Sequence, residues 1–179
     1  MSAQIIDGKK IAADLRQKIA AAIAELTTSH RLIPGLAVVL VGDNPASHVY
    51  VGQKIKACAA SGIKSVECRM AEESKFQDIH AVIDRLNQDP NVDGILMQLP
   101  LPKGITEAEQ SALIEMIHPQ KDVDGLTTAN IGKLMAGQRG LIPCTPQGAL
   151  HLIKTVEPDL TGLHAVVIGR SLLFGKPMG

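Results

Sequence analysis

The order of apolar and polar positions predicts alternating strands and helices. Apolar residues at intervals of three and four mark one face of a helix near the N-terminus, at Ile11, Leu15, Ile19, Ile23 and Leu26. Residues 36–41 form an unbroken apolar run rich in valine, which predicts a buried strand. Further strands are expected at residues 63–68, 92–98 and 165–168, and further helices at residues 47–62, 74–87, 106–117, 128–135 and 147–156. This alternation indicates βαβ units, so we predict an α/β fold with a parallel sheet.

Local signals mark where several of these helices begin and end. Side chains that accept hydrogen bonds from the first turn of a helix favour N-caps, and Gly favours the position after a helix. The expected caps are Ser47, Thr145 before Pro146, Gly62, and the capping boxes Ser74 with Gln77 and Thr106 with Glu109.

The chain divides near Thr145. Residues 1–145 are expected to form a catalytic domain, and residues 146–179 the beginning of a Rossmann-like dinucleotide-binding domain. A strand followed by a glycine-bearing turn opens such a domain, but its remaining strands do not follow in this sequence. We therefore expect the second domain to be truncated.

Composition excludes several functional classes. The 18 basic and 18 acidic residues cancel, so no basic surface for nucleic acid or an anionic membrane is expected. The three cysteines show no Cys-x-x-Cys spacing and are expected to be reduced thiols of a cytoplasmic protein. Residues 1–10 lack the apolar core of a secretory signal, and no apolar run approaches the ~20 residues that span a bilayer. The histidines fall at no metal-ligand spacing, so no metal is expected.

The most informative residues are Tyr50 and Lys54, which lie one turn apart on the same face of a predicted helix. That helix starts at the carboxyl end of a buried strand, where open α/β sheets place their ligands. An amine partly removed from water there would exchange protons near neutral pH. The alternatives are a solvated surface charge for Lys54 and a packing role for Tyr50.

Two later segments supply further polar groups that could face the same ligand as Lys54. Gln98 follows a predicted strand and precedes Leu99-Pro100-Leu101-Pro102, where its amide could orient a lysine or a substrate carbonyl, or simply satisfy loop backbone groups. The prolines favour a stiff, extended wall that suits a planar ring. In Asp122-Val123-Asp124-Gly125 one carboxylate is expected to cap the turn or pair with Lys121, while the other faces a ligand. The sequence Asp-Val-Asp-Gly also occurs in ordinary turns.

The last motif follows the strand expected at residues 165–168. It reads Gly169-Arg170-Ser171 with Gly175 four residues later, a Gly-x-Ser-x-x-x-Gly pattern. Glycine permits a tight turn, and Ser171 with backbone amides could bind phosphate at a helix N-terminus. An ordinary strand–helix connection would look similar, because the usual Gly-x-Gly-x-x-Gly is absent.

Taken in order, these segments resemble the bifunctional methylenetetrahydrofolate dehydrogenase/cyclohydrolase family. The resemblance covers essentially the whole chain. It is carried by residues 41–47, 50–54, 93–102, 121–125, 143–146 and 169–171.

The resemblance implies a homodimeric enzyme of one-carbon metabolism whose two α/β domains flank a folate-binding cleft. Such enzymes oxidise 5,10-methylenetetrahydrofolate with NADP and hydrolyse the methenyl product to 10-formyltetrahydrofolate. By position it implies catalysis by Lys54, Tyr50 and Gln98, and folate contacts from Tyr50, Lys54, Leu99 and Asp124. The NADP contacts that it implies are Thr145, Gly169, Arg170, Ser171 and Gly175.

Two other functions remain open. The chain could be a folate-binding, dimerising module with little turnover, and we expect weak NADP binding and poor dehydrogenase activity. It could also be another NADP-dependent α/β enzyme that uses a lysine, such as a shikimate-type dehydrogenase. That class would pair its lysine with an aspartate on the same ligand, which Tyr50 with Gln98 fits less well.

Overall fold

The computed structural model describes residues 5–179, so the first four residues of the chain lie outside it. Its elements follow the predicted alternation through the first three strands. They are α1 (Gly8–His30), β1 (Gly35–Val41), α2 (Pro45–Ser61), β2 (Lys64–Met70), α3 (Phe76–Gln88), β3 (Gly94–Met97), α4 (Glu107–Glu115), α5 (Thr128–Met135), α6 (Cys144–Lys154) and α7 (Gly175–Met178).

Within the described residues the strands form one parallel sheet of three, in the order β2-β1-β3. The central strand pairs on both sides, with Val39 opposite Cys68 in β2 and opposite Met97 in β3. A parallel pair needs a crossover between its strands, and α2 and α3 provide the crossovers. The predicted α/β class with a parallel sheet is thereby confirmed.

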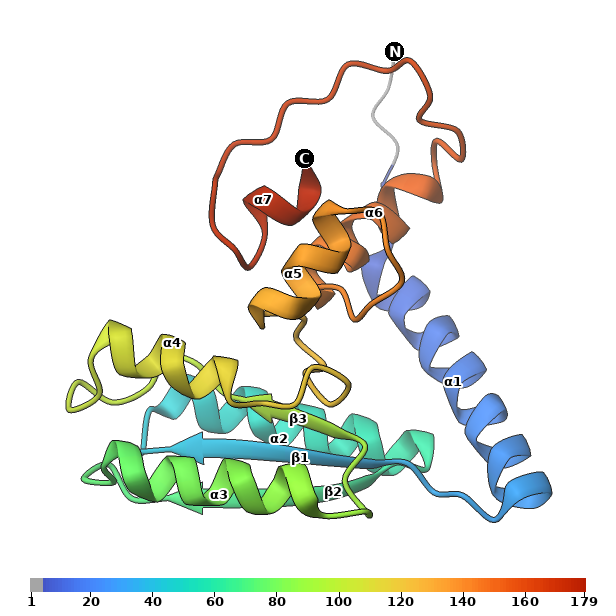
Figure 1. Ribbon diagram of the computed structural model, residues 1–179. Helices are drawn as coiled ribbons and strands as arrows, with labels where there is room; N and C mark the ends of the chain where they lie inside the picture. Colours follow the sequence, from blue (N-terminus) through green and yellow to red (C-terminus); the bar gives the residue numbers. More distant parts are fainter. Residues whose placement is uncertain (1–4) are drawn as a thin grey trace.

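Helices cover both faces of this sheet (Figure 1). Alternate side chains of β1 point to opposite faces, because the side-chain period of a strand is two residues. Val39 and Val41 pack with Ile79 and Ile83 of α3, in a core that α4 also joins. On the other face Val38 and Leu40 pack with Val51 of α2. The unbroken apolar run at residues 36–41 therefore reflects burial on both faces.

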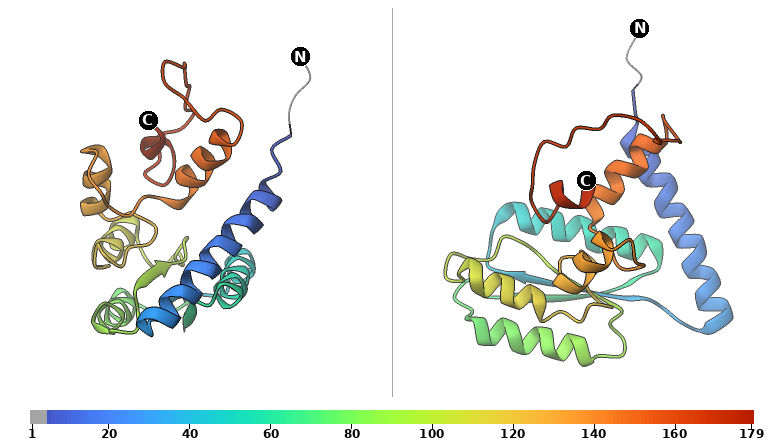
Figure 2. Two further views of the ribbon diagram at one scale, coloured as in Figure 1. Left: turned by 90° about the vertical axis from the view of Figure 1, so that its right-hand side faces the viewer. Right: turned by 45° about the horizontal axis from the view of Figure 1, so that its top comes forward.

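The long helix α1 lies against α2 at the side of the sheet. Of its apolar stripe only Ile23 is buried, while Leu15, Ile19 and Leu26 remain partly exposed. Figure 2 shows α1 along one flank of the molecule, with α5, α6 and α7 gathered apart from the sheet.

Several predicted helix caps are wrong. The side chain of Asn44, not Ser47, accepts hydrogen bonds at the start of α2. At α3 the N-cap is Lys75, whose backbone N–H donates to Asp78 Oδ2 at 2.8 Å, so the Ser74 and Gln77 box does not form. The start of α6 lies at Cys144, which places Thr145 inside the first turn. These N-caps differ by one to three residues from the predicted ones, and at α3 and α6 the observed N-cap residues Lys75 and Pro143 make no side-chain capping bond that a sequence pattern could mark.

Other local predictions are confirmed. Thr106 and Glu109 form the expected capping box of α4, with Glu109 N–H donating to Thr106 Oγ1 at 3.2 Å. Gly62 ends α2 with φ of 80°, a left-handed conformation that glycine adopts without steric cost.

The strand expected at residues 165–168 is not formed. Val166 is 87% exposed and Ile168 is 93% exposed, and no strand of the described chain pairs with them. A strand exists only through hydrogen bonds to a neighbour, so the apolar pattern alone does not produce one. Within residues 5–179 every helix is too short or too polar to cross a lipid bilayer.

Candidate active site

A hydrogen bond joins Lys54 of α2 to Gln98, the residue directly after β3. Lys54 Nζ donates to Gln98 Oε1 at 3.0 Å, and Gln98 Nε2 donates to the carbonyl of Leu99 at 2.7 Å. The backbone N–H of Gln98 also donates to Val39 O at 2.9 Å, which ties the residue to the central strand. Both ends of the amide are therefore engaged, and its oxygen is fixed toward the lysine. The contact is the one that a lysine-orienting glutamine requires.

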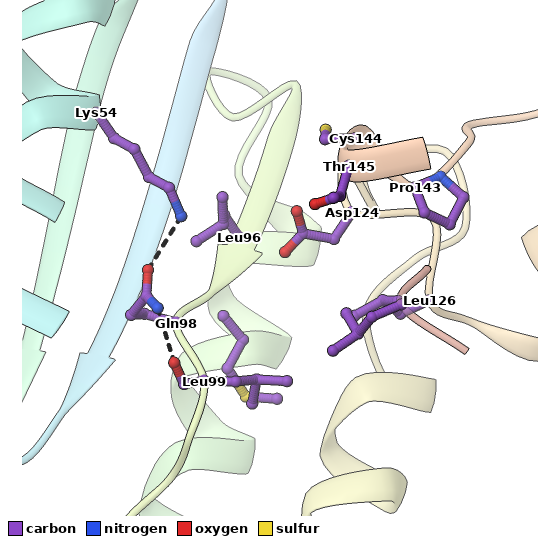
Figure 3. Close-up of a pocket in the computed structure, with 11 residues that line it drawn as sticks. Lys54, Leu96, Gln98, Leu99, Asp124, Leu126, Pro143, Cys144 and Thr145 are labelled. Atoms are coloured by element: carbon purple, nitrogen blue, oxygen red, sulfur yellow. Dashed lines mark hydrogen bonds between the residues drawn. The ribbon is translucent and has the colours of Figure 1, made fainter. Parts of the chain in front are cut away.

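Asp124 lies across the same space (Figure 3). It belongs to the turn of residues 122–125, which is closed by a hydrogen bond from Gly125 N to Asp122 O at 3.0 Å. Burial raises the pKa of the Asp124 carboxyl above its ordinary value, and this outweighs the opposing effect of the positive Lys54. The negative Asp122 nearby raises that pKa further.

These side chains line a pocket of about 280 Å³ at the carboxyl end of β3. Its polar groups come from Lys54, Gln98, Asp124 and Thr145, while apolar side chains make up most of the remaining wall. The lining is Lys54, Leu96, Met97, Gln98, Leu99, Asp124, Leu126, Pro143, Cys144, Thr145 and Leu173. A few polar groups converging within an apolar wall are typical of small-molecule sites.

Gly125 allows the wall of this pocket to close. Its φ is 63°, and a side chain there would come within 2.9 Å of the backbone of Leu141, Ile142 and Pro143. The turn that bears Asp124 can therefore pack directly against the segment that leads into α6.

The prolines after Gln98 occupy a different place from the expected one. Pro100 and Pro102 line a neighbouring pocket of about 500 Å³ together with the β1–α2 turn, rather than the pocket of Lys54. The expected stiff wall therefore borders the adjacent hollow.

Cys144 is a lining residue that the sequence did not single out. Its thiol donates to Val123 O at 3.5 Å. Burial of the sulfur raises the pKa of the thiol, although the residue as a whole is exposed, and the Asp124 carboxylate raises it further. We give the thiol no chemical role, because a raised pKa leaves it in the less reactive neutral form.

Tyr50 does not line the pocket. It lies on α2 one turn before Lys54, as expected, but its side chain is 59% exposed. The ring is accessible to a ligand that extends out of the pocket, and its predicted contact with the folate and its predicted part in catalysis stay predictions.

The residues expected to contact NADP do not all lie at the pocket. Thr145 lines the pocket, whereas Gly169, Arg170 and Ser171 are exposed outside it. Their turn folds back onto Gly175, where a side chain would collide with the backbone of Gly169 and Arg170. Ser171 Oγ accepts a hydrogen bond from Phe174 N at 3.2 Å. A tight, glycine-dependent turn that precedes a helix fits a phosphate-binding loop.

Asp122 has a separate role from Asp124. Residues two apart in a regular strand share a face, so it is the turn at residues 122–125 that separates the two carboxylates. Asp122 Oδ2 accepts hydrogen bonds from Thr127 and Asn130 and faces away from solvent. The Asp122 carboxylate accepts from the start of α5 rather than capping the turn of residues 122–125, and Lys121 donates to backbone carbonyls of Leu86, Asn87 and Asp89 rather than pairing with an aspartate. Sequence analysis did not find the partners Thr127 and Asn130.

Two domain families match this chain. Residues 6–124 match the tetrahydrofolate dehydrogenase/cyclohydrolase catalytic domain, and residues 143–179 match the NAD(P)-binding domain of the same enzymes. The first match covers well over half of the sequence and contains Lys54, Gln98 and Asp124. The chain belongs to the tetrahydrofolate dehydrogenase/cyclohydrolase family.

Individual relatives agree with this assignment. The chain is 52% identical over 178 residues to the bifunctional protein FolD of Bradyrhizobium sp. (strain BTAi1), covering 99% of this chain and 60% of that protein. It is similar in structure to the bifunctional FolD of Campylobacter jejuni, with a TM-score of 0.92, 42% identity, and coverage of 98% of this chain and 61% of that one.

A third relative is a FolD structure from Trypanosoma brucei that was solved in complex with NADP cofactor and an inhibitor. It has a TM-score of 0.92 and 28% identity, and the likeness covers 99% of this chain and 60% of that one. This chain therefore spans about 60% of the length of the curated relatives that it matches. Within residues 5–179 no group of three or more His, Cys, Asp or Glu side chains is arranged to hold a metal ion.

Proposed function

We propose that the pocket of Lys54, Gln98 and Asp124 binds tetrahydrofolate derivatives and hydrolyses 5,10-methenyltetrahydrofolate to 10-formyltetrahydrofolate. The observation that carries this proposal is the 3.0 Å hydrogen bond between Lys54 Nζ and Gln98 Oε1, at the edge of a pocket that also holds Asp124. Membership of the folate family supports the choice of substrate.

Hydrolysis needs a group that moves a proton. Water adds to the cationic methenyl carbon and releases one proton, which gives a neutral hydroxyl adduct. The bond from that carbon to N5 then breaks, while the hydroxyl loses its proton to form the formyl carbonyl and N5 gains a proton. Lys54 Nζ is the group in the pocket suited to receive and return it, with Gln98 fixing its direction. Asp124 would accept hydrogen bonds from the amino-pyrimidine edge of the folate, and its carboxylate attracts the cationic ring.

The dehydrogenase reaction is the second half of the proposal. We propose that NADP binds at Thr145, Gly169, Arg170, Ser171 and Gly175, with Arg170 contacting the 2′-phosphate, and that bound NADP supplies the hydride-acceptor chemistry. The exposed segment at residues 165–168 offers that turn little support. We therefore expect these 179 residues by themselves to bind NADP weakly and to oxidise methylenetetrahydrofolate poorly.

Assembly and location complete the proposal. We propose a homodimer, in agreement with the family resemblance, and a cytoplasmic enzyme that needs neither nucleic acid nor a membrane. The domain boundary near Thr145 stays a prediction.

A spectrophotometric assay tests the hydrolysis directly. Loss of methenyl absorbance at neutral pH should exceed the buffer rate, and Gln98→Ala should lower the enzymatic rate about tenfold or more because Lys54 loses its fixed acceptor. Gln53→Ala is the matched control, since Gln53 is exposed on the same helix and should leave the rate unchanged.

The outcomes separate the candidate functions. Folate binding without hydrolysis would favour the binding module, and neither binding nor hydrolysis would contradict the proposal. Calorimetric titration with NADP measures the nucleotide site; micromolar affinity would contradict the expected weakness.

A further inference from the structure

A buried polar cluster lies directly beside the residue that faces the pocket. Asp122, Thr127 and Asn130 are each only 1% exposed. Asp122 Oδ2 accepts three hydrogen bonds, from Thr127 N at 2.9 Å, Thr127 Oγ1 at 2.8 Å and Asn130 Nδ2 at 2.9 Å. All three donors converge on one carboxylate oxygen, so the position of Asp122 relative to the start of α5 is tightly specified.

Asn130 extends this cluster back along the chain. Its Nδ2 also donates to Pro119 O at 2.8 Å, so both amide hydrogens are used. One acceptor, Pro119, precedes Lys121 in the chain, and the other, Asp122, follows it. The Oδ1 atom of Asn130 accepts no hydrogen bond from the described residues. Asn130 therefore contributes to the cluster by donating.

The other side of the segment is fixed as well. Lys121 Nζ donates to three carbonyls at the end of α3, at 3.1, 2.8 and 2.9 Å. Its own carbonyl accepts from Ile95 N at 2.7 Å, next to the isolated bridge between Ile95 and Asp122. The backbone is thus held against α3 and β3 on one side and against α5 on the other.

Asp124 stands two residues after Asp122, inside the same closed turn. Its carboxylate can remain in the pocket only if the backbone of this turn keeps its place. Burying a carboxylate costs desolvation free energy, and apolar side chains could fill the same volume without that cost. Hydrogen-bonded networks of this kind specify position more sharply than apolar contacts do.

We propose that Asp122, Thr127 and Asn130 form a positioning cluster that sets where the Asp124 carboxylate stands in the pocket. The proposal rests on the proposed folate function, in which Asp124 contacts the substrate. The three residues touch no substrate; they act through the backbone of residues 122–125.

Thr127→Val tests the cluster, because it removes the hydroxyl that donates to Asp122 with little change in volume. The same hydroxyl accepts from Asn130 N at 3.4 Å as the N-cap of α5, so the variant is compared in its folded state. Thr128→Val is the matched control: Thr128 also donates its hydroxyl and its N–H to one carboxylate, Glu115 Oε1, at 2.6 and 2.8 Å, but away from Asp122. Thr127→Ser keeps the hydroxyl and serves as the rescue variant.

Three measurements on the folded variants give the readout. The dissociation constant for 5-formyltetrahydrofolate, a stable folate, should rise about tenfold or more in Thr127→Val, and KM for methenyl hydrolysis should rise more than kcat falls. Thr127→Ser and Thr128→Val should stay within about twofold of the wild type. A purely structural role would lower the melting temperature of Thr127→Val while leaving the affinity of the folded protein unchanged, and that result would overturn the proposal.

A ligand-free measurement separates this proposal from the folate function. Should the wild type fail to bind the folate, the proposed function fails, and the cluster is then judged by NMR of the free protein. Thr127→Val should shift the amide signals of residues 123–125 and the carboxyl carbon of Asp124, whereas Thr128→Val should not; unchanged signals would overturn it. Should Thr127→Val not fold, Asn130→Ala, which removes the other donor, takes the same measurements.

Discussion

Residues 36–41 and residues 165–168 are both short, apolar and rich in valine, yet their surroundings are opposite. Val38 and Val39 of β1 are almost completely buried between two strands and two helices, whereas Val166 and Ile168 project into solvent. The amides of residues 165–168 donate no backbone hydrogen bond within the described chain, while β1 pairs along both edges.

The comparison shows that partners, rather than local pattern, make a strand. β1 is central because both of its neighbours are supplied by the same 97 N-terminal residues that contain it. The proposed site is divided between the same two regions. Lys54, Gln98 and Asp124 come from the well-packed region, whereas the proposed phosphate turn follows the unpaired segment at residues 165–168.

Hydrogen exchange offers the largest contrast between the two regions. Amides of Val38 and Val39 should exchange at least about 1,000 times more slowly than those of Val166 and Val167, because β1 opens only with the global fold. Exchange read by NMR measures both sets in one sample. Comparable protection at residues 165–168 would show that this segment is paired in solution.

Truncation of one isoleucine in each region gives the second contrast. Ile95→Ala in β3 should lower the free energy of unfolding by about 2–5 kcal/mol, because Ile95 is fully buried and leaves a cavity. Ile168→Ala should change it by less than about 0.5 kcal/mol. Urea denaturation measures both, and an equal loss at Ile168 would contradict the difference in packing.

Two aspartates provide the smallest and most specific contrast. Burial raises the pKa of Asp124, whereas hydrogen bonds from Thr161 lower the pKa of the exposed Asp159. A raised pKa means that the folded state keeps a proton which the unfolded chain has lost, so the stability from Asp124 falls as the pH rises through its folded pKa. For Asp159 the sign is reversed: its contribution is present above the ordinary pKa and is lost as the pH falls.

The directions of the two pKa shifts predict how replacing each aspartate by asparagine changes stability. At pH 7 Asp124→Asn should be more stable than the wild type, and its advantage should shrink as the pH falls toward 3.8, the ordinary value. Asp159→Asn should bring no gain at pH 7. Urea unfolding across that pH range measures both variants, and a pH-independent advantage for Asp124→Asn would contradict the assigned cause.

Much of the fold could be predicted from sequence because its signals are local and agree with one another. Residues 128–135 form a helix as predicted, and the first three strands lie close to their predicted positions. The caps at Ser47, Ser74 and Thr145 were misplaced: Asn44 caps α2 instead of Ser47, while α3 and α6 begin after Lys75 and Pro143, which make no side-chain capping bond. The strand at residues 165–168 failed for a non-local reason, since no pattern within it reports whether partners exist.

The site was predictable to a similar extent. Gln98 follows the carboxyl end of β3 and Lys54 belongs to the helix that follows β1, so topology brings these two together. Asp124 joins them because Asp122, two residues earlier, forms an isolated bridge with Ile95 of β3. The apolar lining, such as Leu126 and Leu173, carries no sequence signal that separates it from ordinary core. The partners of Asp122 were also missed, although the Thr127-x-x-Asn130 spacing at a helix start is typical of capping and could have suggested them.

The central claim is that Lys54, held by Gln98 beside Asp124, performs the proton transfer of methenyl-folate hydrolysis. The most direct test is the hydrolysis rate of Lys54→Met, with Lys56→Met as the control because Lys56 is exposed on the same helix. We predict that Lys54→Met loses at least about 100-fold in kcat, as expected for removal of a general acid–base, while its fold and the activity of Lys56→Met are retained. Wild-type hydrolysis by a folded Lys54→Met protein would contradict the account.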